Sequence, residues 1–264
     1  MRILSLVVGL SLVGCVTGEI GSTGGDDTGG DDGSGSGSGS GSQTAEPRLD
    51  LTTDNPTVNT ELGTTTMITV NIDTANFTGP VNLTASVINP TTMTAVPGWT
   101  VALSQATVDV TADGIVPVVA TLTIPALNGG ELSGTVTIDA TSSVGNKSVA
   151  STVTALNQYS MTLLGTATGQ CALVANQAVT LKVNTKLRVV NKFTTNDSVI
   201  VHGIGAIPHQ DQGGTGTPKD GAYEVTRTTP GDGYWWCHDP GMELGLATAG
   251  DPTSRRDPHV TWVQ

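Results

Sequence analysis

The chain has 264 residues, of which 23 are acidic and 11 are Lys or Arg, and its formal net charge of −12 argues against binding to nucleic acid or to an anionic membrane by electrostatics. Charged residues make up 13% of the chain and aromatic residues 3%, while glycine occurs 34 times. Without long Leu-, Glu- and Lys-rich runs, the chain lacks the composition of coiled coils and long helices, and its Thr, Val and Ala content favours an all-β architecture.

The N-terminus has the features of an export signal. A short positive region at residues 1–2 precedes a twelve-residue, mainly apolar region at 3–14, a length that suits a signal peptide and is too short for a transmembrane helix. The segment Leu12-Val13-Gly14-Cys15 resembles the lipobox of bacterial lipoproteins, which implies a signal peptide at 1–14 and lipidation of Cys15. An ordinary secretory signal with an incidental cysteine is the alternative. Because residue 16 is Val, the resemblance implies a lipid-anchored protein of the bacterial cell envelope, placed at the outer membrane.

Residues 15–46 combine the cysteine with a linker of Gly, Ser and Asp. A segment of this composition cannot bury enough apolar area to offset the entropy lost on ordering. We therefore expect a disordered spacer that holds the rest of the chain away from the membrane.

Residues 47–157 show the period-two alternation of half-buried strands. Apolar residues recur on one face in five segments: Ile68, Val70 and Ile72; Val81, Leu83, Ala85 and Val87; Trp99, Val101 and Leu103; Ala120, Leu122 and Ile124; and Val136, Ile138 and Ala140. The segment resembles bacterial immunoglobulin-like domains, which implies a β-sandwich. Since it contains no Cys, no His and no clustered carboxylates, we expect a spacer or an interaction module here.

Residues 158–264 hold all four histidines, the two other cysteines and three of the four tryptophans. Their pattern again predicts a β-sandwich. The expected strands are Ser160–Leu164, Ala178–Val183, Lys186–Val190, Ser198–His202, Ala222–Arg227, Gly233–Cys237 and His259–Val263.

Two clusters in this second unit carry metal-binding side chains. One contains His202 and continues to Ile207-Pro208-His209-Gln210, and the other runs from Tyr234-Trp235-Trp236-Cys237 through His238 to Met242. In this order they resemble the cupredoxin family of blue-copper proteins, over residues 186–246. The resemblance implies one copper ion bound by imidazoles, a soft thiolate and a weak axial thioether.

The resemblance leaves the second imidazole open. The family usually has a histidine a few residues beyond the cysteine, but Pro240 and Met242 stand there in this chain. Either His238 turns toward the metal, or His202 joins His209. The full set of candidate ligands is His202, His209, Cys237, His238 and Met242.

A disulfide between Cys171 and Cys237 is the competing interpretation, since Cys15 is committed to lipid and disulfides persist in exported proteins. Such a bond would consume the thiolate that blue copper requires.

We therefore expect a membrane-anchored copper protein that transfers single electrons to a redox protein partner, rather than an enzyme. The alternative is a non-catalytic surface or adhesion module that is closed by the Cys171–Cys237 disulfide and binds no metal. The sulfur of Cys237 discriminates between the two hypotheses: it faces either imidazoles or the other cysteine.

Overall fold

A computed structural model describes residues 45–127, 129–166, 170–173, 178–194, 198–210, 215–238 and 258–264. All regular elements named within these ranges are β-strands, so the predicted all-β class is confirmed. Residues Thr44–Gln264 form one compact unit, which contains two hydrophobic cores. In the part of the chain described here, no helix has the length and apolarity needed to cross a bilayer. The predicted signal peptide, Cys15 and the greater part of the linker lie outside the described residues.

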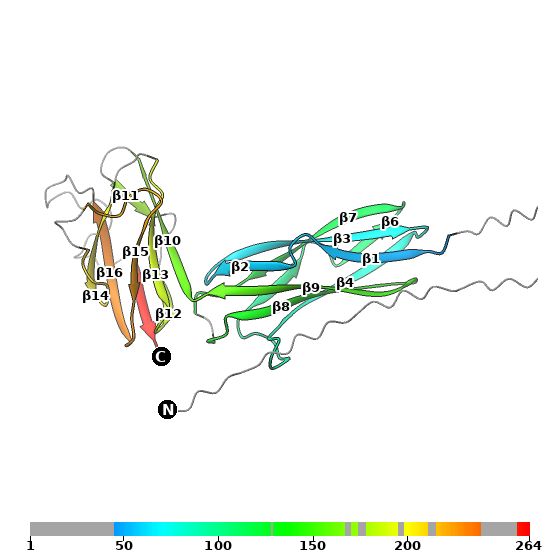
Figure 1. The fold of residues 1–264 in the computed structure, drawn as a ribbon, viewed down its shortest axis with the longest axis horizontal. Helices are drawn as coiled ribbons and strands as arrows, with labels where there is room; N and C mark the ends of the chain where they lie inside the picture. The colour runs from blue at the N-terminus through cyan, green and yellow to red at the C-terminus, as the bar shows by residue number, and fades with distance from the viewer. Residues whose placement is uncertain are drawn as a thin grey trace, which may run out of the picture. The chain divides into compact units, whose positions relative to one another are not determined.

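The first core lies between a four-stranded and a five-stranded sheet (Figure 1). The four-stranded sheet has the order β1-β3-β7-β5, formed by Arg48–Thr53, Thr65–Ala75, Gly114–Thr123 and Thr100–Leu103. The five-stranded sheet has the order β2-β9-β8-β4-β6, formed by Thr57–Glu61, Gly145–Leu156, Ser133–Ser142, Gly79–Ile88 and Thr107–Val110. Neighbouring strands are antiparallel except for β2 and β9, which are parallel.

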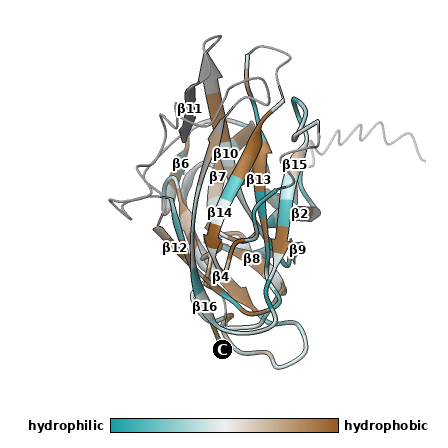
Figure 2. Ribbon diagram, turned by 90° about the vertical axis from the view of Figure 1, so that its left-hand side faces the viewer, coloured by the Kyte–Doolittle hydropathy of each residue, from teal (hydrophilic) through white to brown (hydrophobic). Residues whose placement is uncertain are grey.

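The predicted alternation accounts for this core. Ile68, Val70 and Ile72 of β3 are all fully buried, and Val136 and Ile138 of β8 face them from the other sheet. Hydrophobic and polar bands alternate along the strands in Figure 2. Intervening Thr, Asn and Ser residues point away from the core, because successive side chains on a strand leave opposite faces of the sheet.

The second core lies between two further four-stranded sheets. One has the order β11-β10-β13-β15, formed by Gln170–Leu173, Gln158–Thr166, Lys186–Asn191 and Ala222–Thr226. The other has the order β12-β17-β16-β14, formed by Ala178–Lys182, His259–Val263, Gly231–His238 and Ile200–Gly205. Each sheet contains one parallel pair, β10 with β13 and β12 with β17, and its other pairs are antiparallel.

Each of the seven strands expected in the second unit overlaps an observed strand, and His259–Val263 matches β17 at both ends. The prediction missed β11, which has only four residues and begins at Gln170. A segment this short offers too few residues to establish a period of two. The omission matters for function, because β11 contains Cys171 and contacts β16, which contains Cys237.

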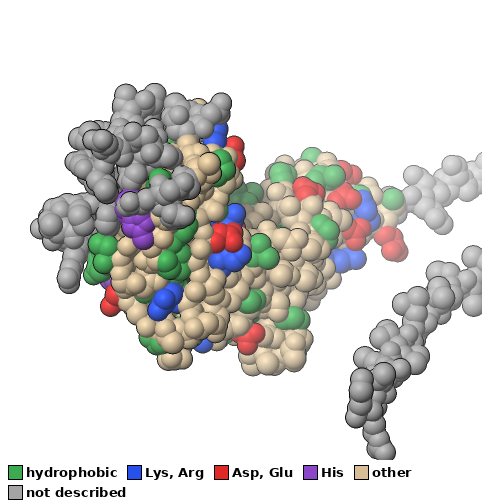
Figure 3. All heavy atoms as spheres, turned by 60° about the vertical axis from the view of Figure 1, so that its left-hand side comes forward, with side chains coloured by type: hydrophobic (Ala, Val, Ile, Leu, Met, Phe, Trp, Pro, Cys, Tyr) green, Lys and Arg blue, Asp and Glu red, His purple; other side chains and the backbone are tan. Residues whose placement is uncertain are grey.

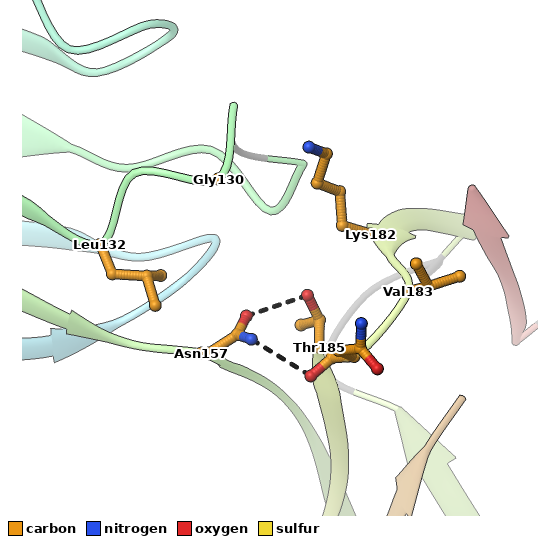
Figure 4. A pocket seen from close by; sticks show the side chains of 7 residues that line it. Gly130, Leu132, Asn157, Lys182, Val183 and Thr185 are labelled. Carbon is orange, nitrogen blue, oxygen red and sulfur yellow. Dashed lines mark hydrogen bonds between the residues drawn. The ribbon is translucent and has the colours of Figure 1, made fainter. Parts of the chain in front are cut away.

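Asn157 alone separates β9 from β10, and its side chain bonds to the turn between β12 and β13 (Figure 4). Its amide nitrogen donates to the carbonyl of Asn184 at 3.1 Å, and its amide oxygen accepts from the hydroxyl of Thr185 at 3.0 Å. The backbone nitrogen of Lys186 also donates to the Asn157 carbonyl at 3.1 Å. These bonds restrain the predicted boundary between the two units; whether the units fold separately stays a prediction.

Candidate functional site

His202 occupies the third position of β14 and is 2% exposed. β14 lies at the edge of its sheet and pairs with β16 in continuous antiparallel register, so that His202 stands opposite Trp236. The segment around Thr217 covers the outer side of this edge strand near its start, where Thr217 and Val199 exchange both backbone hydrogen bonds. His202 is thus buried in the middle of an otherwise apolar strand, although that strand lies at the edge of its sheet.

The chain turns back immediately after β14 and returns alongside it. Gly205 has φ = +70°, a left-handed conformation that glycine adopts without steric cost. A Cβ atom on Gly203 would overlap the carbonyl oxygens of Ile207 and Pro208, so the returning loop passes directly over this residue. Ile207 itself is 1% exposed and belongs to the second core. The loop is therefore packed against the strand rather than held out in solvent.

This return brings His209 against His202. Nε2 of His209 contacts Nδ1 of His202, and the rings meet edge to face, with centroids 4.0 Å apart and planes at 84°. Nδ1 of His209 contacts the carbonyl oxygen of Gln210. Histidine side chains, drawn in purple, reach the surface in Figure 3. Of the predicted ligand pairs, His202 with His209 is the one that the described residues bring into contact.

Gln210 and Tyr223 hold the loop that carries His209. The Gln210 backbone nitrogen donates to the Val201 carbonyl at 2.9 Å, and its side-chain oxygen accepts from the Val201 nitrogen at 3.0 Å. The Tyr223 hydroxyl, which comes from the opposite sheet, donates to the Pro208 carbonyl at 2.5 Å. Burial raises the pKa of Tyr223, so its hydroxyl stays a proton donor at neutral pH.

Cys237 lies in β16, is 1% exposed, and is disulfide-bonded. Cys237 stands directly opposite Val201 in β14, and both side chains belong to the second core. His202 follows Val201 and therefore leaves the sheet on the opposite face. In this structure the sulfur of Cys237 is committed to another sulfur, and it is directed away from the side of the sheet on which His202 lies.

The remaining predicted ligands cannot be placed. The side chain of His238 and the whole of Met242 lie outside the described residues. Within the described part of the chain, no group of three or more His, Cys, Asp and Glu side chains is arranged as metal ligands would be.

His259 belongs to a polar cluster on β16 and β17. Its ring stacks on Tyr234 with centroids 4.4 Å apart, and its Nε2 lies 3.2 Å from the Asp232 carboxylate. The Thr261 hydroxyl donates to the same carboxylate at 2.7 Å and, with His259, lowers the pKa of Asp232. The Thr261 hydroxyl and the Asp232 carboxylate both approach Nε2 of His259, at 3.4 and 3.2 Å, whereas a catalytic relay places the hydroxyl and the carboxylate on different ring nitrogens.

Sequence reasoning missed the residues that support the histidine pair. Nothing in the alternation of residues 222–226 indicates that Tyr223 reaches the loop on the opposite sheet. The glycines at 203 and 205 and the proline at 208 are a recognisable turn signal, and they could have indicated a chain reversal between the two histidines.

The pocket drawn in Figure 4 lies near Asn157 and carries no comparable chemistry. It is lined by Gly130, Leu132, Asn157, Lys182, Val183, Asn184 and Thr185. Lys182 is the only ionisable side chain in that lining, and the Asn157 amide is already bonded to Asn184 and Thr185. The histidine pair is therefore the stronger candidate site.

No protein-family model and no curated protein matches this chain.

Proposed function

We propose that this chain is a lipid-anchored, non-catalytic binding module of the bacterial cell envelope, stapled by a disulfide between Cys171 and Cys237. The disulfide-bonded state of Cys237 carries the proposal. A disulfide sulfur is not a thiolate and therefore cannot act as the cysteine ligand that a blue-copper site requires.

The position of β11 supports Cys171 as the partner of Cys237. β11 contains Cys171 and contacts β16, the strand of Cys237. Cys15, the only other cysteine, is the residue that the lipobox resemblance assigns to lipid. A 171–237 bond would close a loop of roughly 65 residues and would stabilise the fold by about 4 kcal/mol in the chain-entropy model.

The rest of the proposed role follows from the order of the segments. The apolar signal and Cys15 supply the anchor, and the Gly/Ser/Asp linker supplies reach. The first sandwich then offers sheet faces covered with Thr, Ser and Asn, as in β3, β8 and β9. The immunoglobulin-like and cupredoxin-like assignments of the sandwiches are part of this proposal.

Peptide mapping without reduction tests the staple. Digestion of the purified protein should release one linked pair of peptides that contain residues 171 and 237, and titration of the unfolded protein should detect no thiol from either residue. A Cys237 thiol that reacts under these conditions would refute the proposal.

Single-electron transfer at a blue-copper centre is the second candidate, and the contact between His202 and His209 favours it. It requires Cys237 as a thiolate. Under this hypothesis, reduction followed by Cu(II) should produce an intense visible charge-transfer band that Cys237→Ser abolishes. The band should be absent if Cys237 serves only as a staple.

A further inference from the structure

We propose that the two sandwiches unfold as one cooperative unit, because a junction of hydrogen bonds and packed side chains couples their cores. The connection between β9 and β10 is a single residue, Asn157. The junction consists of three consecutive residues of the first sandwich and four residues of the second: Glu61, Leu62 and Gly63 with Gln158, Tyr159, Ser160 and Arg188. This inference goes beyond the proposed function, since it holds whatever the module binds.

The Glu61 carboxylate is the main acceptor of the junction. Glu61 is the last residue of β2, and its side chain is 22% exposed. Its Oε1 accepts from the Gln158 amide at 2.5 Å and from Nη1 of Arg188 at 3.3 Å, and its Oε2 accepts from the Ser160 hydroxyl at 2.6 Å. The two oxygens of a carboxylate have enough lone pairs for all three donors. Because the acceptor is charged, these bonds are stronger than bonds between neutral groups.

The three donors come from one sheet of the second sandwich. Gln158 and Ser160 are the first and third residues of β10, and Arg188 stands opposite Ser160 in the neighbouring strand β13. Alternate residues of a strand leave the same face of a sheet, so the donors from β10 lie together. Arg188 also bonds to Glu224 of β15. A single carboxylate of the first sandwich is therefore connected to three adjacent strands of the second.

Apolar packing accompanies these hydrogen bonds. The Tyr159 ring packs against the second core, and so does Ala126, which follows β7 of the first sandwich. The same ring covers Gly63, where an added Cβ would lie 2.3 Å from a ring carbon. Leu62, which is 1% exposed in the first core, donates its backbone nitrogen to the Gln158 carbonyl at 3.0 Å. Contacts therefore continue from the first core to the second.

The connecting residue is restrained as well. Asn157 bonds to Asn184 and Thr185, and the three residues after it all belong to the junction. A hinge requires residues that change their backbone dihedrals without losing contacts, and Asn157 cannot do so. Unfolding of either sandwich would remove bonding partners from the other. This mutual dependence is the physical basis of cooperative unfolding.

Hydrogen exchange of the full-length protein over a series of urea concentrations, followed by mass spectrometry, tests the coupling. Peptides from β3 report on the first core, and peptides from β13 report on the second. In the wild type, we expect the two unfolding midpoints to agree within about 0.2 M urea. In Glu61→Ala they should separate by about 0.5 M or more, because three donors lose a charged acceptor while both cores stay intact.

Three further variants serve as controls. Ile68→Val removes a buried methylene of the first core outside the junction, so it should lower both midpoints together. Ser160→Ala removes one donor and keeps the carboxylate, so it should separate the midpoints by less than Glu61→Ala does. It also provides the test if Glu61→Ala does not fold. Asp139→Ala removes an exposed carboxylate that lies outside every ion pair among the described residues, and it should leave both midpoints unchanged.

Three results would overturn the proposal. Separate midpoints in the wild type would mean that Asn157 links two independently folding domains. Coincident midpoints in both Glu61→Ala and Ser160→Ala would mean that the junction does not couple the sandwiches. A separation in Ile68→Val as large as that in Glu61→Ala would mean that lost stability alone causes the effect.

Discussion

Cys237 shows how one side chain can carry two incompatible chemistries from the same sequence. Beside histidines and a methionine it resembles a copper ligand, and beside a second exported cysteine it resembles half of a disulfide. Neither interpretation follows from residue type. The bond that its sulfur makes distinguishes the copper ligand from the disulfide cysteine, and in this structure that bond is a disulfide.

The partner of Cys237 can be identified by measuring stability. If the bond joins residues 171 and 237, Cys171→Ser, Cys237→Ser and the double variant should each lose the same amount, about 4 kcal/mol of unfolding free energy. The double variant should add nothing, because one bond is lost in all three. Urea unfolding measures this, and additive losses in the double variant would contradict the assignment.

Glu224 provides a pH-dependent contribution to stability. A hydrogen bond from Lys186, assisted by Arg188, holds the pKa of the Glu224 carboxyl below its ordinary value of 4.5, although partial burial opposes this. Because the pKa of Glu224 is lower in the folded than in the unfolded protein, its ion pairs stabilise the fold at pH values above the unfolded-state pKa. This contribution is lost as the pH falls through the folded-state pKa. Glu224→Gln should therefore cost up to about 1 kcal/mol at pH 7 and nothing near pH 2, since these groups are largely exposed.

Urea unfolding of wild type and Glu224→Gln across this pH range checks the expectation. Asp109→Asn is the control, because Asp109 lies outside every ion pair among the described residues. A constant difference between wild type and Glu224→Gln at all pH values would show that the carboxylate charge is not the cause.

At the scale of elements, the turn between β14 and Gln210 brings His202 and His209 into contact. The turn depends on Gly203, over which the returning chain passes with no room for a Cβ atom. It also depends on Gly205 and its positive φ. The histidine contact is therefore a consequence of glycine placement as much as of the histidines themselves.

Gly203→Ala tests this dependence. The added methyl would meet backbone oxygens that cannot rotate away, so we expect a loss of about 1–3 kcal/mol, the usual cost of forcing extra volume into a packed site. The histidine contact should be displaced as well. Gly231→Ala is the matched control, because the nearest atom to its added Cβ is the side chain of Ala206 at 3.4 Å.

Thermal unfolding compares Gly203→Ala with Gly231→Ala, and histidine chemical shifts report on the pair. Equal stabilities together with unchanged histidine shifts would mean that the loop does not pass over β14 as described.

At the scale of the whole molecule, the order of segments predicts an anchored protein. The apolar stretch is followed by Cys15, a polar linker and two β-sandwich cores. If lipid on Cys15 is the anchor, the wild type should partition into the detergent phase and Cys15→Ala should not. Ser11→Ala, a change within the apolar stretch, should behave like wild type. Equal partitioning of wild type and Cys15→Ala would rule out the lipid anchor.

The sequence by itself determined the all-β class and most strands, because period-two alternation is a local property that survives wherever a strand has one face in a core. It supported Ile68, Val70 and Ile72 as core residues, and it singled out His202, His209 and Cys237 as the residues with chemistry. The sequence could not determine which of these three side chains contact one another. The side chains of Cys237 and His202 leave opposite faces of the sheet because of the register in which β14 pairs with β16. These strands are about thirty residues apart in the sequence, so no local pattern encodes their register. Two further interactions form only when the two sheets pack around one core: the contact of β11 with β16, and the hydrogen bond from the Tyr223 hydroxyl to the Pro208 carbonyl. The tertiary structure alone therefore decided which side chains meet.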